Sequence, residues 1–183
     1  PTSNPFNDVS LDDWFYDYVM YAYEKGLMKG TEADLFEPET DVTRAMFVTV
    51  LHRMEGTPRV GTVNFDDVDG GEYYADAVAW AQENKIVNGT TGTTFEPNAK
   101  ITREQMAAIV YRYARYKGRS IYAAETAEYT DSDSISDYAK DAVNWLSYHK
   151  ILLGNADGTF APQKNSTRAE TAAVFQRIAE NLK

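Results

Sequence analysis

The sequence predicts an all-α protein made of three helix-loop-helix repeats, arranged about a pseudo-threefold axis around a central three-helix bundle. One unit recurs at residues 6–56, 65–118 and 129–179. Each copy has two segments with apolar residues at helical spacing, and glycine and proline mark irregular chain between them. We divide the chain into repeat 1 (residues 1–58), repeat 2 (59–120) and repeat 3 (121–183). Because one such unit is too small to bury a full core alone, we expect the repeats to form one cooperative domain.

The three repeats carry the same or similar residue types at many aligned positions. The matched sets are Trp14, Tyr73 and Tyr138; Asp17, Asp76 and Asp141; Gly30, Gly89 and Gly154; Phe36, Phe95 and Phe160; Pro38, Pro97 and Pro162; and Arg44, Arg103 and Arg168. Repetition within the chain therefore shows which positions the fold or the function needs.

Each unit opens with an Asp-containing turn, which leads to an amphipathic first helix. In repeat 1, the apolar residues at helical spacing are Trp14, Tyr18, Val19 and Ala22. Gly26 is expected to end this helix in the left-handed conformation. The equivalent residues in the other repeats lack the conformational freedom of glycine; they are Lys85 and Lys150.

The second helix of each unit is expected to begin after a threonine N-cap, whose hydroxyl accepts a hydrogen bond from the N3 amide. These threonines are Thr43, Thr102 and Thr167. Gln105 and Glu170 stand at N3 and complete capping boxes, whereas Met46 cannot. The second helices are apolar on nearly all sides, which predicts that they occupy the interior.

Composition excludes several classes of partner. The chain has 18 Lys and Arg against 28 Asp and Glu, for a formal charge of −10. This charge argues against general binding to nucleic acid or anionic lipid. The chain has no cysteine, no apolar run long enough to span a bilayer and no signal segment. It begins at Pro1 without methionine, so we expect a mature or excised piece of a longer protein.

An arginine follows the cap threonine in every repeat: Arg44, Arg103 and Arg168. A cation at N1 faces the positive end of the helix dipole, at a cost of about 0.3–1 kcal/mol. One interpretation is an internal salt bridge to Asp17, Asp76 or Asp141. In the other, which the recurrence favours, the guanidinium and free helix-end amides form an anion site that holds a carboxylate.

Aromatic residues recur in two series, for which core packing is the default interpretation. The series are Trp14, Tyr73 and Tyr138, and Tyr21, Trp80 and Trp145. One of them could instead line grooves between the lobes, where a ring face suits a sugar. A second set of arginines lies near the ends of the second helices, where a cation complements the dipole, and we interpret it as structural; it comprises Arg53, Arg112 and Arg177.

The residues support no catalytic or metal site. His52 and His149 are the only histidines and occupy non-equivalent positions, so they build neither a metal cluster nor a repeated catalytic triad. The Asp131–Ser134 segment resembles the start of a calcium loop but lacks its sixth-position glycine. We therefore expect no enzyme activity, no metal and no cofactor.

The order of these motifs resembles the S-layer homology domain family. The resemblance is carried by the residues 6–9 turn, the Gly26–Gly30 segment, the Phe-x-Pro motif and the Thr-Arg-Ala motif, and it is closest over residues 154–170. Three tandem copies are the family's usual number. The resemblance implies a three-pronged helical domain that anchors surface-layer proteins and wall enzymes non-covalently to secondary cell wall polysaccharide, outside a bacterial cell.

Family ligands often carry a pyruvate ketal on N-acetylmannosamine, and the ketal supplies a carboxylate. The resemblance implies binding grooves between neighbouring prongs, with the motif arginines as ligands. The implied positions are Arg44, Arg103 and Arg168, bordered by Gly30, Gly89, Gly154, Trp14, Asp17, Tyr73, Asp76, Tyr138 and Asp141. The chain departs from the pattern at Met46, at Gln105 and in the 90–93 loop. Glu104 beside Arg103 weakens the expectation of a carboxylate site at the second motif.

The leading hypothesis is therefore a non-catalytic wall-binding module, secreted and fused to a further domain in its parent protein, without nucleic acid partners or membrane insertion. A protein-protein interaction module for surface assembly is the alternative, and it predicts a large exposed apolar patch. A glycan-processing enzyme is a further rival, which predicts product release from wall polymer.

Overall fold

The computed structural model describes residues 3–182, and over this range it is all-α, as the sequence predicts. The six α-helices are α1 (Tyr16–Glu24), α2 (Arg44–Met54), α3 (Ala75–Glu83), α4 (Arg103–Tyr116), α5 (Lys140–Tyr148) and α6 (Arg168–Asn181), with two short 3-10 helices, η1 (Ser132–Ser134) and η2 (Asp137–Ala139). No strand occurs within the described range.

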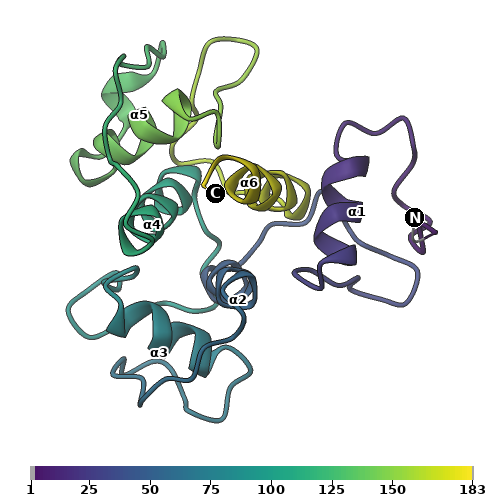
Figure 1. Ribbon diagram of the computed structural model, residues 1–183, viewed down its shortest axis with the longest axis horizontal. Coiled ribbons are helices and arrows are strands. Elements are labelled where there is room, and N and C mark those ends of the chain that lie inside the picture. The colour runs from purple at the N-terminus through teal and green to yellow at the C-terminus, as the bar shows by residue number, and fades with distance from the viewer. Residues whose placement is uncertain (1–2, 183) are drawn as a thin grey trace.

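Helices α2, α4 and α6 lie near the centre of the molecule, and α1, α3 and α5 lie outside them (Figure 1). Each outer helix packs against a central helix that belongs to a different repeat. The pairs are α3 with α2, α5 with α4, and α1 with α6. The α1–α6 pair joins the first repeat to the last, so each repeat completes a neighbour.

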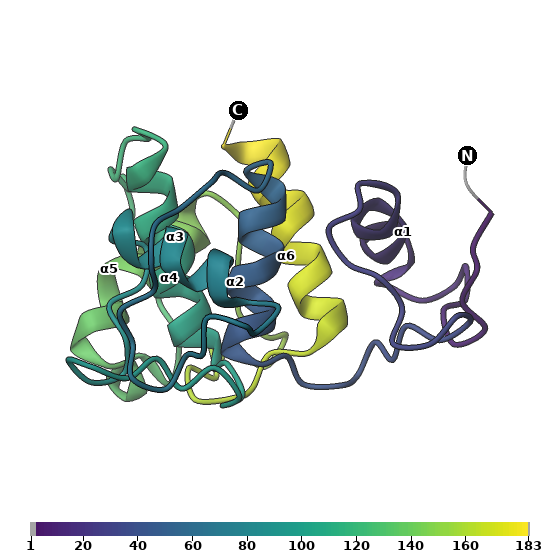
Figure 2. The same ribbon diagram turned by 90° about the horizontal axis from the view of Figure 1, so that it is seen from below.

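The segments that enter the central helices are tied together by a closed ring of backbone hydrogen bonds. The Val42 N–H donates to the Ser166 carbonyl at 2.9 Å, the Ser166 N–H to the Ile101 carbonyl at 3.0 Å, and the Ile101 N–H to the Val42 carbonyl at 2.9 Å. Figure 2 shows these entry loops at one end of the upright central helices. Each repeat contributes one residue, so the ring places the helix N-termini relative to one another.

The predicted N-caps are confirmed in all three repeats. The hydroxyls of the cap threonines accept hydrogen bonds from the amides of Met46, Gln105 and Glu170, and the last two side chains complete capping boxes. Gly26 has a positive φ of 67° and ends α1 as expected. Lys85 and Lys150 adopt the same conformation, with φ of 58° and 55°.

A repeated helix stop explains why lysine is tolerated in this conformation. The amide after Lys85 belongs to Ile86, which donates to the Ala81 carbonyl at 2.8 Å, and Ile151 donates likewise to Leu146 at 2.9 Å. Both isoleucines are fully buried. This bond and the apolar contact define a Schellman motif, which offsets the strain of a left-handed lysine.

The two aromatic series differ in how far their side chains are buried. Trp80 and Trp145 are buried in the core, as expected, whereas Tyr21 is partly buried and packs against the core. The core interpretation of Trp14, Tyr73 and Tyr138 is wrong, because these side chains are 58%, 65% and 54% exposed. They precede the first turns of α1, α3 and α5 and so do not share the buried face of those helices.

Candidate functional site

The motif arginines are buried, and each reaches into a loop of another repeat. Arg168 is 5% exposed; its Nε donates to the Phe36 carbonyl at 2.7 Å, and its guanidinium lies 4.5 Å from the centre of the Phe36 ring. Arg44 has the same contacts with Phe95 and Arg103 with Phe160. Carbonyl dipoles and ring faces thus hold these cations in place.

The internal salt-bridge interpretation is wrong for the described residues. None of the three motif arginines forms an ion pair within residues 3–182. Asp17, Asp76 and Asp141 are exposed on the outer helices and lie apart from the arginines' contacts. Carboxylates therefore do not neutralise these guanidinium groups directly.

The expectation of free helix-end amides is also wrong. The Arg44 and Ala45 amides donate to the carbonyls of Ala99 and Pro97 at 2.9 and 3.0 Å, and α4 and α6 begin with equivalent bonds. The third amide of each helix is taken by the cap threonine. The neighbouring repeat's loop therefore occupies the helix N-terminus, and the first three amides of each central helix are not free to bind an anion.

The aspartate of each opening turn builds the loop that the arginine contacts. Both carboxylate oxygens of Asp8 accept amide hydrogen bonds, from Phe36 at 2.9 Å and Glu37 at 2.7 Å. Glu37 has a positive φ of 54°. Asp67 and Asp131 do the same in repeats 2 and 3. This role of the aspartates was not predicted, although their recurrence in all three opening turns was the available signal.

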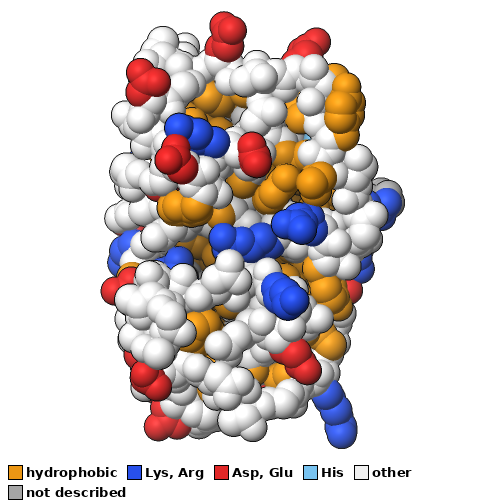
Figure 3. Space-filling model, turned by 90° about the vertical axis from the view of Figure 1, so that its left-hand side faces the viewer, with side chains coloured by type: hydrophobic (Ala, Val, Ile, Leu, Met, Phe, Trp, Pro, Cys, Tyr) orange, Lys and Arg blue, Asp and Glu red, His pale blue; other side chains and the backbone are white. Residues whose placement is uncertain are grey.

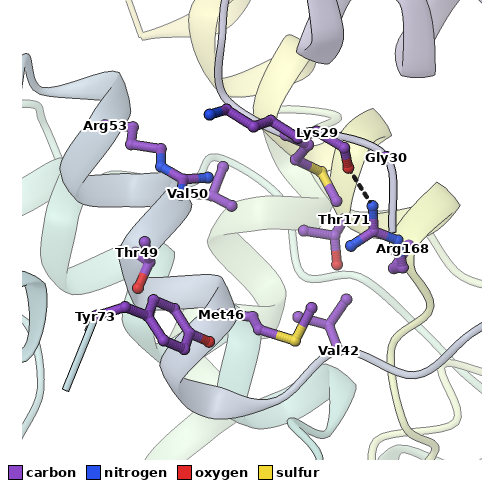
Figure 4. Close-up of a pocket in the computed structure, with 11 residues that line it drawn as sticks. Lys29, Gly30, Val42, Met46, Thr49, Val50, Arg53, Tyr73, Arg168 and Thr171 are labelled. Atoms are coloured by element: carbon purple, nitrogen blue, oxygen red, sulfur yellow. Dashed lines mark hydrogen bonds between the residues drawn. The ribbon is translucent and has the colours of Figure 1, made fainter. Parts of the chain in front are cut away.

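A pocket of about 180 Å³, which we call groove 1, collects residues from all three repeats. Gly30 comes from repeat 1, Tyr73 from repeat 2 and Arg168 from repeat 3, with Arg53 on α2. Figure 4 shows Arg53 and Arg168 on different sides of this space, with the Lys29 carbonyl accepting a hydrogen bond from Arg168 at 2.6 Å.

A second pocket of about 380 Å³, groove 2, presents the same groups at aligned positions. Its lining includes Gly89, Tyr138, Arg44 and Arg112. Arg53 and Arg112 therefore line grooves, whereas we had interpreted them as purely structural. Their alignment with each other was the signal, but the partners across each groove come from repeats distant in the chain.

In the third set of equivalent residues, the arginine near the end of the central helix is arranged differently. Arg177, which corresponds to Arg53 and Arg112, lies 5.1 Å over the Tyr18 ring and donates to its hydroxyl at 3.3 Å. Arg103 donates to the Leu153 carbonyl at 2.7 Å, as Arg168 does to that of Lys29. Repeats 2 and 3 have alanine where repeat 1 has Tyr18, so this arginine–tyrosine contact occurs at one position only.

The glycines of the set have a steric role. A Cβ on Gly30 would come within 2.6 Å of the Leu35 carbonyl, and one on Gly154 within 2.8 Å of that of Thr159. Gly89 adds a positive φ of 80°. Gly30 and Gly89 also line grooves 1 and 2. Any side chain at these positions would displace the loop that forms the groove wall.

Burial shapes the electrostatics of both grooves. Desolvation lowers the pKa of Arg44, Arg112 and Arg168 below the usual arginine value. Burial also raises the pKa of Tyr138 to about 12, with Glu104 adding to the effect. Burial raises the pKa of Tyr73 as well. At neutral pH the tyrosines are therefore uncharged hydroxyl donors beside cationic arginines.

Glu104 was expected to interfere with Arg103, but its hydrogen-bond partners lie elsewhere. Its buried carboxylate accepts hydrogen bonds from the Ser136 amide at 2.9 Å, the Ser136 hydroxyl at 2.7 Å and Gln163 at 2.8 Å. It also accepts one from the Tyr138 hydroxyl at 3.3 Å. Glu104 therefore faces repeat 3 and holds the groove 2 tyrosine.

With this arrangement established, comparison with known proteins identifies the family. The S-layer homology domain model matches residues 5–46, 64–107 and 128–172. The chain belongs to the S-layer homology domain family and contains three tandem copies of the repeat.

The similar proteins are much longer than this chain. An endoglucanase from Bacillus sp. strain KSM-635 is 37% identical over 95% of the chain, which spans 18% of that protein. The S-layer protein sap of Bacillus anthracis is 30% identical over 94% of the chain, which spans 21% of it. A cellulosome-anchoring protein from Acetivibrio thermocellus is 26% identical over 84%, which spans 35% of it.

Two other kinds of feature are absent from residues 3–182. No helix there combines the length and apolar character needed to cross a membrane. Nor do three His, Asp or Glu side chains come together in that range in a way that could hold a metal ion.

Proposed function

We propose that this chain is a non-catalytic carbohydrate-binding module that anchors a larger protein to secondary cell wall polysaccharide at a bacterial surface. Grooves 1 and 2 each hold an acidic sugar, most simply a pyruvylated N-acetylmannosamine. The observation that carries the proposal is the recurrence of one set of groups, a glycine, a tyrosine and two arginines, in both grooves.

Each groove has the donors that a carboxylate needs. A guanidinium carries five N–H donors, and Arg168 uses two of its groups, Nε and Nη2, for the carbonyls of Phe36 and Lys29. Arg53 donates from Nη1 to the Leu27 carbonyl at 2.9 Å. The remaining donors of both arginines are available to a ketal carboxylate by charge-assisted hydrogen bonds. The exposed ring of Tyr73 offers an apolar face to the sugar, as Tyr138 does in groove 2.

An acidic protein needs such directed contacts to hold an acidic glycan. With a net charge of −10, the field of the whole chain repels a polyanion. Local arginine pairs can overcome this repulsion because they act at hydrogen-bonding distance. The printed names of the relatives, an S-layer protein and a cellulosome-anchoring protein among them, support attachment at the cell surface. The short span of the chain on these relatives supports fusion to a further domain.

Sedimentation with cell walls tests the proposal. Walls that retain pyruvylated polymer should bring down the protein, and walls from which the ketals have been removed by mild acid should not. Equal retention by both preparations would refute the ligand assignment. Retention that requires another surface protein would support the protein-interaction alternative instead.

A further inference from the structure

Groove 2 adjoins a second pocket, which we call the side pocket. A pocket also adjoins groove 1 and shares Arg53 with it, but there the acid Glu55 pairs with Lys117 at 2.8 Å. The side pocket, of about 460 Å³, is lined by Asn84, Lys85, Asn88, Arg112, Arg115 and Tyr116. Asn88 and Arg112 also line groove 2, so the two pockets adjoin each other. The side pocket thus extends the groove along α4, between that helix and the end of α3.

The lining of the side pocket is basic and contains no acid. Within the described residues, the side chains of Lys85, Arg112 and Arg115 form no ion pair and no hydrogen bond. Desolvation lowers the pKa of Arg112, and the nearby cation Arg115 lowers it further, while Tyr138 acts in the opposite direction. Three cations with unused donors therefore surround a space in a protein that is acidic overall.

Figure 3 views this side of the molecule and shows lysine and arginine side chains gathered in a band across its middle. Aspartate and glutamate lie above and below the band. An anionic chain lying along the band would meet cations over more than one sugar unit.

Tyr116 gives the side pocket a wall suited to a sugar. Its ring packs edge-on against Trp80, with centres 5.8 Å apart, and stacks with Tyr113 at 6.2 Å. The ring is thereby fixed, yet Tyr116 remains 40% exposed. Ring faces beside unpaired donors favour a saccharide carrying an acid over a bare ion.

The other repeats do not reproduce these charges. At the positions of Lys85 and Arg115, repeat 1 has Gly26 and Gly56. Repeat 3 has Lys150 and Glu180. The paired cations are specific to repeat 2, whereas the glycine, the tyrosine and the two arginines recur in both grooves.

We infer that groove 2 and the side pocket form one extended site that binds two successive acidic substituents of a glycan chain, whereas groove 1 binds one. The second substituent is a carboxylate or a phosphate, since guanidinium and ammonium groups bind both. The inference rests on the proposed function and defines the length and charge of the ligand that groove 2 selects.

Calorimetry with three synthetic trisaccharides tests the inference. All carry a pyruvylated N-acetylmannosamine at one end; the unit at the other end is neutral, pyruvylated or phosphorylated. We expect one of the doubly acidic probes to bind the wild type at least about tenfold more tightly than the singly acidic probe, with a steeper salt dependence. The doubly acidic probe that binds more tightly shows whether the second acid is a carboxylate or a phosphate.

Two double variants that change the net charge equally show whether the side pocket causes the gain in affinity. K85Q/R115Q should bind all three trisaccharides equally. R59Q/K140Q removes two exposed cations that line neither groove 2 nor the side pocket, and it should keep the gain. Equal binding of all probes by the wild type, or a gain that survives K85Q/R115Q, would overturn the inference while leaving the proposed function intact. If the wild type binds no probe at all, both fail.

Discussion

A cation at the first position of a helix is unfavourable, and Arg168 shows what offsets the cost here. Its guanidinium is held by two backbone carbonyls and the face of Phe36, all from repeat 1. The unusual position of the arginine could be recognised from the sequence. Its partners could not, because they lie more than a hundred residues away and the contact is to backbone and ring, which carry no charge signature.

Arg112 offers the cleanest test of an arginine's role in binding. It lines groove 2 and forms no hydrogen bond within the described residues, so R112Q should leave the fold intact. We expect the number of sites for a pyruvylated monosaccharide, measured by calorimetry, to fall from two to one. Loss of its charged hydrogen bonds should weaken groove 2 by about 1.5–3 kcal/mol.

Arg177 is the matched control, because it occupies the aligned position in α6 but contacts Tyr18. R177Q should keep both sites and lower thermal stability slightly. Unchanged stoichiometry in R112Q would show that Arg112 does not contact the sugar.

The helices illustrate what periodicity can and cannot predict. Helical spacing, threonine caps and capping boxes predicted the six helices, because these signals are local. The exposure of Tyr73 and the burial of Trp80 could not be distinguished, since both are aromatic and both recur. What separates them is the start of α3 at Ala75, which leaves Tyr73 in the preceding turn.

The C-terminal ends of α2 and α4 are joined by a half-buried acid that makes the pairing pH-dependent. Glu55 accepts hydrogen bonds from Tyr113 at 2.6 Å and Lys117 at 2.8 Å. Burial raises the pKa of Glu55, but the hydrogen bonds from Lys117 and Tyr113 outweigh it, and the net pKa lies below the usual 4.5. The stabilisation is therefore present above about pH 4.5 and is lost as pH falls through the lower folded-state pKa.

Glu55→Gln should consequently lower the free energy of unfolding at pH 7 by about 0.5–1.5 kcal/mol. Urea unfolding at pH 7 and at pH 3 measures this. The difference between wild type and variant should shrink at pH 3, because protonation removes the charge in the wild type as well. A difference that is the same at both pH values would mean that the ion pair contributes nothing.

The three repeats depend on one another through exchanged helices and the ring of Val42, Ile101 and Ser166. Their number and their helix-loop-helix order could be predicted from the internal repetition. The exchange could not, because each outer helix has an apolar face that would equally suit the central helix of its own repeat.

Deleting repeat 3 should therefore destabilise repeat 1. A chain ending at residue 120 loses α6, the partner of α1, and opens the ring. We expect circular dichroism to show helix loss beyond that of the deleted residues, and thermal unfolding to lose its cooperativity. Cooperative unfolding with full helicity in α1–α4 would show that the repeats fold independently.

The central claim, that arginine-lined grooves hold the carboxylate of an acidic sugar, is tested most directly by calorimetric titration of this chain. The two ligands are a synthetic pyruvylated N-acetylmannosamine and its depyruvylated counterpart. We predict binding of the pyruvylated sugar at two sites and at least about tenfold weaker binding without the ketal. Equal affinity for the two sugars would contradict the account.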